Sequence, residues 1–129
     1  MGQRAVLTGA IAQAIIFVIF LTIIHPPPYL YLAAPIAAGI VSAPLSNQYE
    51  KEYIDTGKAA IVGTLLSLVA LVLIAWWNTA MLPPSFQIDL TFLTLAIGLG
   101  IAIVALPIAV LLSASSGHIT LTALESQPR

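Results

Sequence analysis

The 129-residue chain has 7% charged and 60% hydrophobic residues, whereas ordinary soluble domains have roughly 25% charged residues, so it cannot form a water-soluble surface. A net charge of −1 with scattered basic residues excludes a phosphate-binding stripe, and the absence of cysteine excludes disulfides, thiol catalysis and thiolate metal sites. We therefore expect an integral membrane protein that has the lipid bilayer as a partner and binds no nucleic acid.

The first predicted helix covers residues 5–24, which contain no charge and extend about 30 Å, the thickness of one hydrocarbon core. Gln13 is its candidate polar intramembrane residue. It would either line a polar path or form an interhelical hydrogen bond, of about 1 kcal/mol, and the second interpretation is the simpler. Pro26-Pro27-Pro28 then force a turn, because consecutive prolines cannot continue a helix.

The second predicted helix, residues 29–45, is short for a membrane span and contains Pro35, Gly39 and Pro44. Proline removes a backbone hydrogen bond and kinks a helix, which membranes tolerate where neighbouring helices satisfy the freed carbonyls. The sequence favours a full span, with a re-entrant segment as the alternative.

Residues 46–58 hold more than half of the charged side chains and are predicted to form a water-exposed loop; these are Glu50, Lys51, Glu52, Asp55 and Lys58. Such a run is either a plain solvated loop or a surface for a partner. Asp55 or Thr56 is expected to cap the following helix by accepting its free N–H groups.

The third and fourth predicted helices cover residues 59–77 and 90–112, and a second proline turn, with Pro83-Pro84, connects them. Asp89 is expected to cap the fourth helix. The transmembrane domain thus comprises residues 1–113, and residues 114–129 form a short polar C-terminal tail.

Small residues recur at every fourth position in these helices, a pattern that lets membrane helices approach closely. The candidate helix-packing residues are Gly39, Gly63, Ser67, Gly98 and Gly100. Their rows serve either packing inside one four-helix bundle or association with other subunits, and they are numerous enough to serve both.

The basic residues predict the topology. Four spans place the N-terminus, the charged loop and the C-terminus on one face, which then carries Arg4, Lys51, Lys58 and Arg129. Because positive residues stay cytoplasmic, a multi-pass protein with both termini inside is expected. Overall, the sequence predicts an all-α, integral membrane four-helix bundle.

The stretch Ala34-Pro35-Ile36-Ala37-Ala38-Gly39, the charged loop, and Thr56-Gly57-Lys58-Ala59-Ala60-Ile61-Val62-Gly63 together resemble a family of small uncharacterised four-helix membrane proteins of halophilic archaea. The resemblance implies an archaeal membrane protein and no particular activity. Small multidrug-resistance transporters have a similar length, but Gln13 stands where their defining glutamate is expected.

The predicted membrane segments contain no ionisable side chain, whereas proton-coupled transporters and pumps almost always need one. His25 and His118 lie on opposite faces and cannot share a metal. We expect no catalytic residue, cofactor, metal or small-molecule substrate, and a structural or assembly role instead. The protein would be a small subunit of a larger membrane complex or a virion membrane component, through self-association or other subunits. The alternative is a small oligomeric transporter or pore, lined by Gln13, Thr64 and Ser67.

Overall fold

The computed structural model describes residues 2–45 and 52–125, where all regular secondary structure is helical. The elements are α1 (Gly2–Ile19), the π-helical turn η1 (Phe20–Ile24), the 3₁₀ segment η2 (Pro28–Leu32), α2 (Ala33–Ser42), the 3₁₀ turn η3 (Ala43–Leu45), α3 (Glu52–Asn78) and α4 (Pro84–Glu125). Four stretches are long and apolar enough to cross a membrane: Gln3–Ile24, Pro28–Leu45, Ile54–Asn78 and Pro84–Glu125. The predicted all-α, four-helix membrane architecture is confirmed.

The turn between the first two spans is built around the carbonyl of Phe20. The π-helical turn η1 ends where the N–H of His25 donates to Phe20 O at 2.8 Å, and His25 itself is left-handed, with φ 50°. Histidine is among the residues that tolerate this conformation, and the prolines that follow cannot extend the helix. Tyr31 then packs edge-on against the ring of Phe20, at 5.9 Å between centroids, and closes the hairpin.

The second span stays helical through its prolines. Its two ends, η2 and η3, are 3₁₀ helices, which rise about 2.0 Å per residue instead of the 1.5 Å of an α-helix. With these stretched ends, Pro28–Leu45 reaches about 31 Å, enough for one hydrocarbon core. The segment therefore has the length of a full span.

The third helix begins earlier than predicted. Residues 46–51, with Glu50 and Lys51 of the predicted loop, lie outside the described residues, but α3 starts at Glu52. The predicted cap at Asp55 or Thr56 is therefore wrong, because both lie inside the first turns of α3. Both side chains are also buried, since α4 extends across this end of α3 and covers it.

The fourth helix is longer than predicted at both ends. It begins at Pro84, a residue suited to the first helical position, so Asp89 lies within the helix and is not its cap. It continues through Glu125, so residues 114–125 of the predicted tail are helical and only residues 126–129 lie outside the described part. Its 42 residues extend about 63 Å when straight, twice the thickness of a hydrocarbon core.

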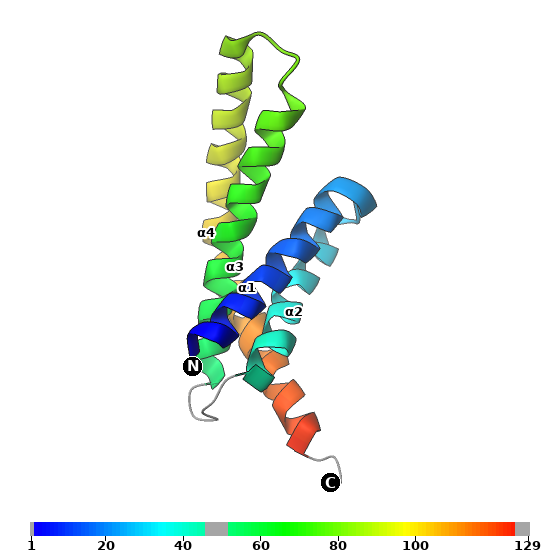
Figure 1. Ribbon diagram of the computed structural model, residues 1–129, viewed down its shortest axis with the longest axis vertical. Coiled ribbons are helices and arrows are strands. Elements are labelled where there is room, and N and C mark those ends of the chain that lie inside the picture. Colours follow the sequence, from blue (N-terminus) through cyan, green and yellow to red (C-terminus); the bar gives the residue numbers. More distant parts are fainter. Residues whose placement is uncertain (1, 46–51, 126–129) are drawn as a thin grey trace.

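The helices form two pairs that diverge (Figure 1). α3 and the first half of α4 make a long hairpin, while α1 and α2 slant away from it and end well short of its tip. The first turn of α1 and the last turn of α4 lie toward the same end of the molecule, which we call the terminal end; the opposite end is the proline-turn end. α1 packs on α2 and α3, and α4 also packs on α2 and α3, so the helices close a four-membered ring near the terminal end.

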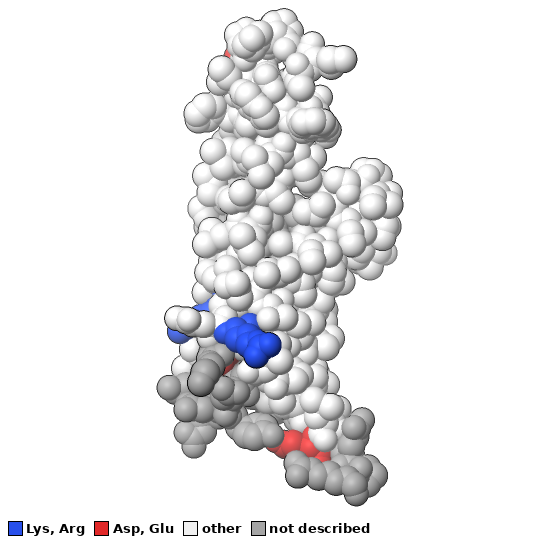
Figure 2. All heavy atoms as spheres, viewed as in Figure 1, with Lys and Arg blue, Asp and Glu red and all other residues white. Residues whose placement is uncertain are grey.

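The charged side chains of the residues that the structure describes lie toward the two ends of the molecule. On the face shown in Figure 2, Lys and Arg gather near the terminal end, a trace of acidic surface lies at the opposite tip, and the surface between them is uncharged. Lys58 and Asn78 bound this zone on α3, and the intervening residues extend about 30 Å. This matches one hydrocarbon core.

Candidate functional site: the small-residue core and a lateral pocket

The core near the terminal end is made of small side chains. Its buried hydrophobic residues are Ala5, Ala10, Ala34, Ala38, Ala43, Ala59, Ala60, Ala109 and Leu121, and its largest fully buried side chains are Thr56, Ser42 and Ser113. At Gly9, a Cβ atom would lie 2.8 Å from Ser42 Cβ and 2.9 Å from Ala59 Cβ. The backbones of α1, α2 and α3 therefore meet at Gly9, which only a glycine permits.

Gly39, a predicted packing residue, lies against the last third of α4. A Cβ there would collide with the backbone of Ser113 and with Ser116 Oγ. Ser116 Oγ donates to Ile36 O of α2 at 2.9 Å, and Ser113 Oγ donates to Thr56 O of α3 at 2.7 Å. Two hydroxyls thus hold α4 against both neighbours.

The sequence reasoning missed Ser113, Ser116 and Gly117, because these residues were placed in or beside a polar tail. Ala109, Ser113 and Gly117 continue the four-residue spacing of small residues beyond the apolar segment, and this signal was available. All three are buried. Gly9 was missed as well, although it lies in the first apolar segment.

Gln13 connects α1 to α3. It is 4% exposed, its amide lies against Gly63, and Nε2 donates to Thr64 Oγ1 at 3.2 Å. Gln13 Oε1 has no hydrogen-bond partner among the described residues. Ser67 is also buried, and its hydroxyl donates to Gly63 O of its own helix at 2.8 Å. The structure thus brings Gln13, Gly63 and Thr64 together at one helix contact.

The two predicted packing residues of α4 face in different directions. Gly98 is buried, and a Cβ there would lie 2.7 Å from Leu68 Cδ1 of α3. Gly100 is exposed, and a Cβ there would meet nothing within 4 Å. Gly98 therefore serves the α3–α4 contact inside the chain, while Gly100 faces outward.

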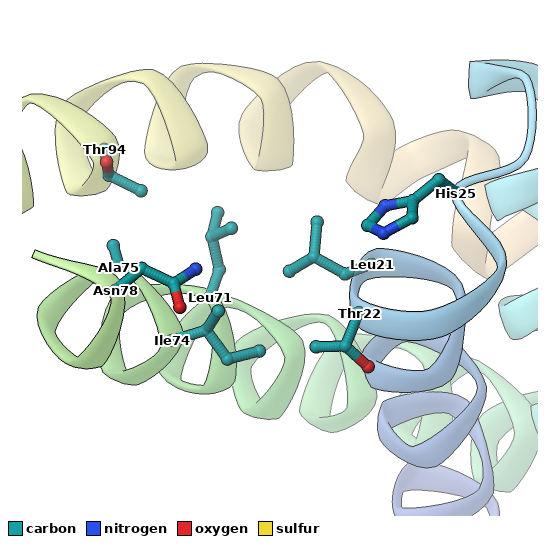
Figure 3. A pocket seen from close by; sticks show the side chains of 8 residues that line it. All are labelled: Leu21, Thr22, His25, Leu71, Ile74, Ala75, Asn78 and Thr94. Atoms are coloured by element: carbon teal, nitrogen blue, oxygen red, sulfur yellow. The ribbon is translucent and has the colours of Figure 1, made fainter.

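A pocket of about 420 Å³ opens where the two helix pairs diverge (Figure 3). It is lined by Leu21, Thr22 and His25 at the end of the first span, by Leu71, Ile74, Ala75 and Asn78 of α3, and by Thr94 of α4. The imidazole of His25 extends from its turn into the space between the helices. The pocket therefore has apolar walls, with Thr22 and His25 at one end and Asn78 and Thr94 at the other.

Among the described residues, no group of three or more acidic or histidine side chains is placed to hold a metal ion. His25 lines the pocket at one end of the molecule, and His118 lies near the other end of α4.

No protein-family model, no curated protein and no solved structure is significantly similar to this chain. The resemblance of residues 34–63 to small membrane proteins of halophilic archaea stays a prediction.

Proposed function

We propose that this protein is a non-catalytic subunit of a larger membrane assembly, formed with further copies or with other membrane proteins. A cellular membrane complex and a virion membrane both fit this role. One observation carries the proposal: the outer face of α4 is left uncovered along its length, with Gly100 in its middle.

This face has a shape suited to another helix. Ala96 and Gly100 are exposed one turn apart, and the larger side chains of Leu93, Ile97 and Val104 are exposed around them. Small residues between large ones form a notch into which a second backbone can settle, which is how membrane helices gain packing energy. The other glycines of the described spans, apart from Gly57, lie in tight contacts within the chain.

The terminal end of α4 adds a second surface for a partner. Beyond the level of Lys58 the helix continues for several turns, and Ile119 and Leu124 are exposed there. Apolar side chains that leave the bilayer gain from being covered by another protein.

We place both termini in the cytoplasm. Arg4 and Lys58, the two basic residues in the described part of the chain, lie near the terminal end, and basic residues favour the cytoplasmic side. Trp76 and Trp77 are exposed near the proline-turn end, where they suit the opposite membrane interface.

The proposal is tested by extraction in mild detergent followed by native mass spectrometry and by crosslinking in intact membranes. We expect a homo-oligomer or a complex with a defined partner. Gly100→Leu, which fills the notch, should dissociate it, whereas Ile101→Leu, about 100° further around the helix, should not. A wild-type chain that is monomeric in both experiments and copurifies with nothing would exclude an assembly role.

The pore alternative has less support. Gln13 Nε2 donates to Thr64 and Ser67 donates to its own helix, so among these side chains only Gln13 Oε1 has no partner in the described residues. Ion or solute flux in proteoliposomes, lost in Gln13→Leu, would favour the pore over the assembly role.

A further inference from the structure

The two helix pairs reach different depths of the bilayer, although their helices are equally long. From Arg4 to Ile24, and from Lys58 to Asn78, each segment extends about 30 Å along its own axis. Arg4 and Lys58 both lie near the terminal end, so the two segments start from the same side. α1 and α2 slant away from the hairpin of α3 and α4, however, and their turn ends well short of its tip (Figure 1).

The labelled side chains of Figure 3 show the same difference in depth. His25, which follows the first span, lies at one end of the pocket, and Asn78, the last residue of α3, lies at the other. Between these two ends, α3 lines the pocket with the apolar side chains of Leu71 and Ile74. The turn at His25 therefore lies at a depth at which the surface of α3 is still apolar.

This turn is poorly suited to hydrocarbon, because several of its backbone carbonyls have no donor. In the π-helical pattern, which His25 N–H completes by donating to Phe20 O, each carbonyl accepts from the N–H five residues ahead. For the carbonyls of residues 21–23 those positions are the prolines 26–28, which have no N–H. The side chain of His25 is exposed as well. In a membrane, polar groups of this kind need water or lipid headgroups.

The hairpin gains nothing by moving outward to bring the turn to the surface. Toward its tip it exposes large apolar side chains, among them Trp77, Met81, Phe86 and Phe92, which would then lie in water. An ångström of mismatch between protein and bilayer costs far less than one unsatisfied polar group in hydrocarbon. The free energy is therefore lowest when the bilayer adjusts its thickness around the protein.

We propose that the face formed by α1 and α2 takes short-chain phospholipids as its neighbours and thins the bilayer there, so that headgroups on the proline-turn side reach His25. On the face formed by α3 and the first half of α4, the bilayer keeps its usual thickness. This inference goes beyond the assembly role and does not depend on it, because it rests on the first two helices and not on the outer face of α4 around Gly100.

Tryptophan quenching by brominated lipids tests the choice of neighbours. In the full chain with Trp76→Phe and Trp77→Phe, one tryptophan is introduced at Ile11→Trp on α1 or at Leu65→Trp on α3. Both positions are exposed, and each lies seven residues past the basic residue of its span. The protein is reconstituted in mixtures of dimyristoleoyl and dioleoyl phosphatidylcholine, with one of the two lipids brominated at a time.

At Ile11→Trp we expect about a twofold preference for the shorter lipid, and at Leu65→Trp none. The second variant is the matched control, because it reports the lipids beside the hairpin of the same molecule. Equal selectivity at both positions would overturn the proposal, whether the cause is a tilt of the whole molecule or a partner that covers the first two helices.

A second arm measures the depth of the turn. Spin labels are attached to single cysteines at Ile24→Cys, Leu73→Cys and Met81→Cys, all exposed positions in a chain without native cysteine. Power saturation in dioleoyl phosphatidylcholine liposomes then compares their access to oxygen and to a water-soluble nickel complex. The labels at Ile24→Cys and Met81→Cys should meet the nickel complex severalfold more often than the label at Leu73→Cys.

Two results of this arm would contradict the thinning. If the label at Ile24→Cys is as sheltered from nickel as the label at Leu73→Cys, the turn lies in hydrocarbon and headgroups do not reach it. If the label at Leu73→Cys is as accessible as the label at Met81→Cys, the hairpin projects into water and the bilayer has no need to thin.

Discussion

The glycines of this protein differ in the atoms that surround them. Gly39 lies against the backbone of Ser113, whereas the position of a Cβ at Gly100 is open. A side chain added at Gly39 meets main-chain atoms of another helix, which cannot rotate away. Close packing at such points tolerates little added volume.

Gly39→Ala is therefore expected to lower the free energy of unfolding by about 1–3 kcal/mol, because α2 and α4 must separate to admit the methyl group. Gly100→Ala should leave it unchanged or raise it by up to about 1 kcal/mol, since alanine favours a helix more than glycine. Circular dichroism during titration with sodium dodecyl sulfate in mixed micelles measures both. Equal effects at the two positions would contradict the packing described here.

Hydroxyl groups add to the small-residue contacts. Ser113 is fully buried and donates to a carbonyl of α3, whereas Thr8 is exposed and donates to Arg4 O within its own helix, at 2.8 Å. Ser113→Ala should lower the free energy of unfolding by about 0.6–1.7 kcal/mol, the magnitude of interhelical hydrogen bonds in membrane proteins. Thr8→Ala is the matched control and should cost nothing measurable in the same titration. If Thr8→Ala lowered the free energy of unfolding as much as Ser113→Ala, the hydrogen bond between helices would not explain the effect of Ser113→Ala.

For α4, hydropathy predicted one part of the helix and missed another. The apolar run 90–112 predicted the membrane-crossing part of the helix. It could not reveal the extension to Glu125, because residues 113–120 are mostly polar or small and are helical through contacts with distant residues. At Gly117, for example, an added Cβ atom would lie 2.7 Å from Thr56 Cγ2 of α3. Hydropathy does not reveal contacts of this kind, although the four-residue spacing of Ala109, Ser113 and Gly117 indicates them.

α4 changes direction between its two halves, and Pro107 lies inside it (Figure 1). Proline removes the bond to Ile103 O and its ring pushes the preceding turn aside, which bends the helix. Without the bend, the last third of α4 would not lean across α2.

Pro107→Ala should straighten α4 and lengthen the distance between spin labels at Leu93→Cys and Thr122→Cys. A straight helix separates these positions by about 44 Å along its axis, and a bent one by less. Double electron–electron resonance in nanodiscs measures the distance, and the absence of native cysteine makes the labelling specific. Ile108→Ala, a neighbouring exposed substitution that keeps the backbone bond pattern, is the control. An unchanged distance in Pro107→Ala would show that tertiary contacts alone set the bend.

For the whole molecule, the sequence predicted the number of spans and the shared location of the termini, because apolar length and proline turns determine them. It did not predict which small residues face inward. Gly98 and Gly100 are two positions apart and equally apolar in context, and only the packing of α3 against α4 separates them. The sequence did not predict the pocket either, because the pocket arises from the angle between the two helix pairs.

The orientation of the whole molecule depends on very few charges, and labelling of single cysteines tests it directly. Ser85→Cys lies at the proline-turn end, Thr122→Cys at the terminal end, and Leu73→Cys within the apolar zone of α3. With both termini in the cytoplasm, a membrane-impermeant maleimide should label Ser85→Cys in intact cells and Thr122→Cys only after permeabilisation. Leu73→Cys should stay unlabelled in both conditions, because a thiol surrounded by hydrocarbon stays protonated and unreactive. The reverse pattern at Ser85 and Thr122 would place the termini outside and require the basic residues near Arg4 and Lys58 to serve a purpose other than topology.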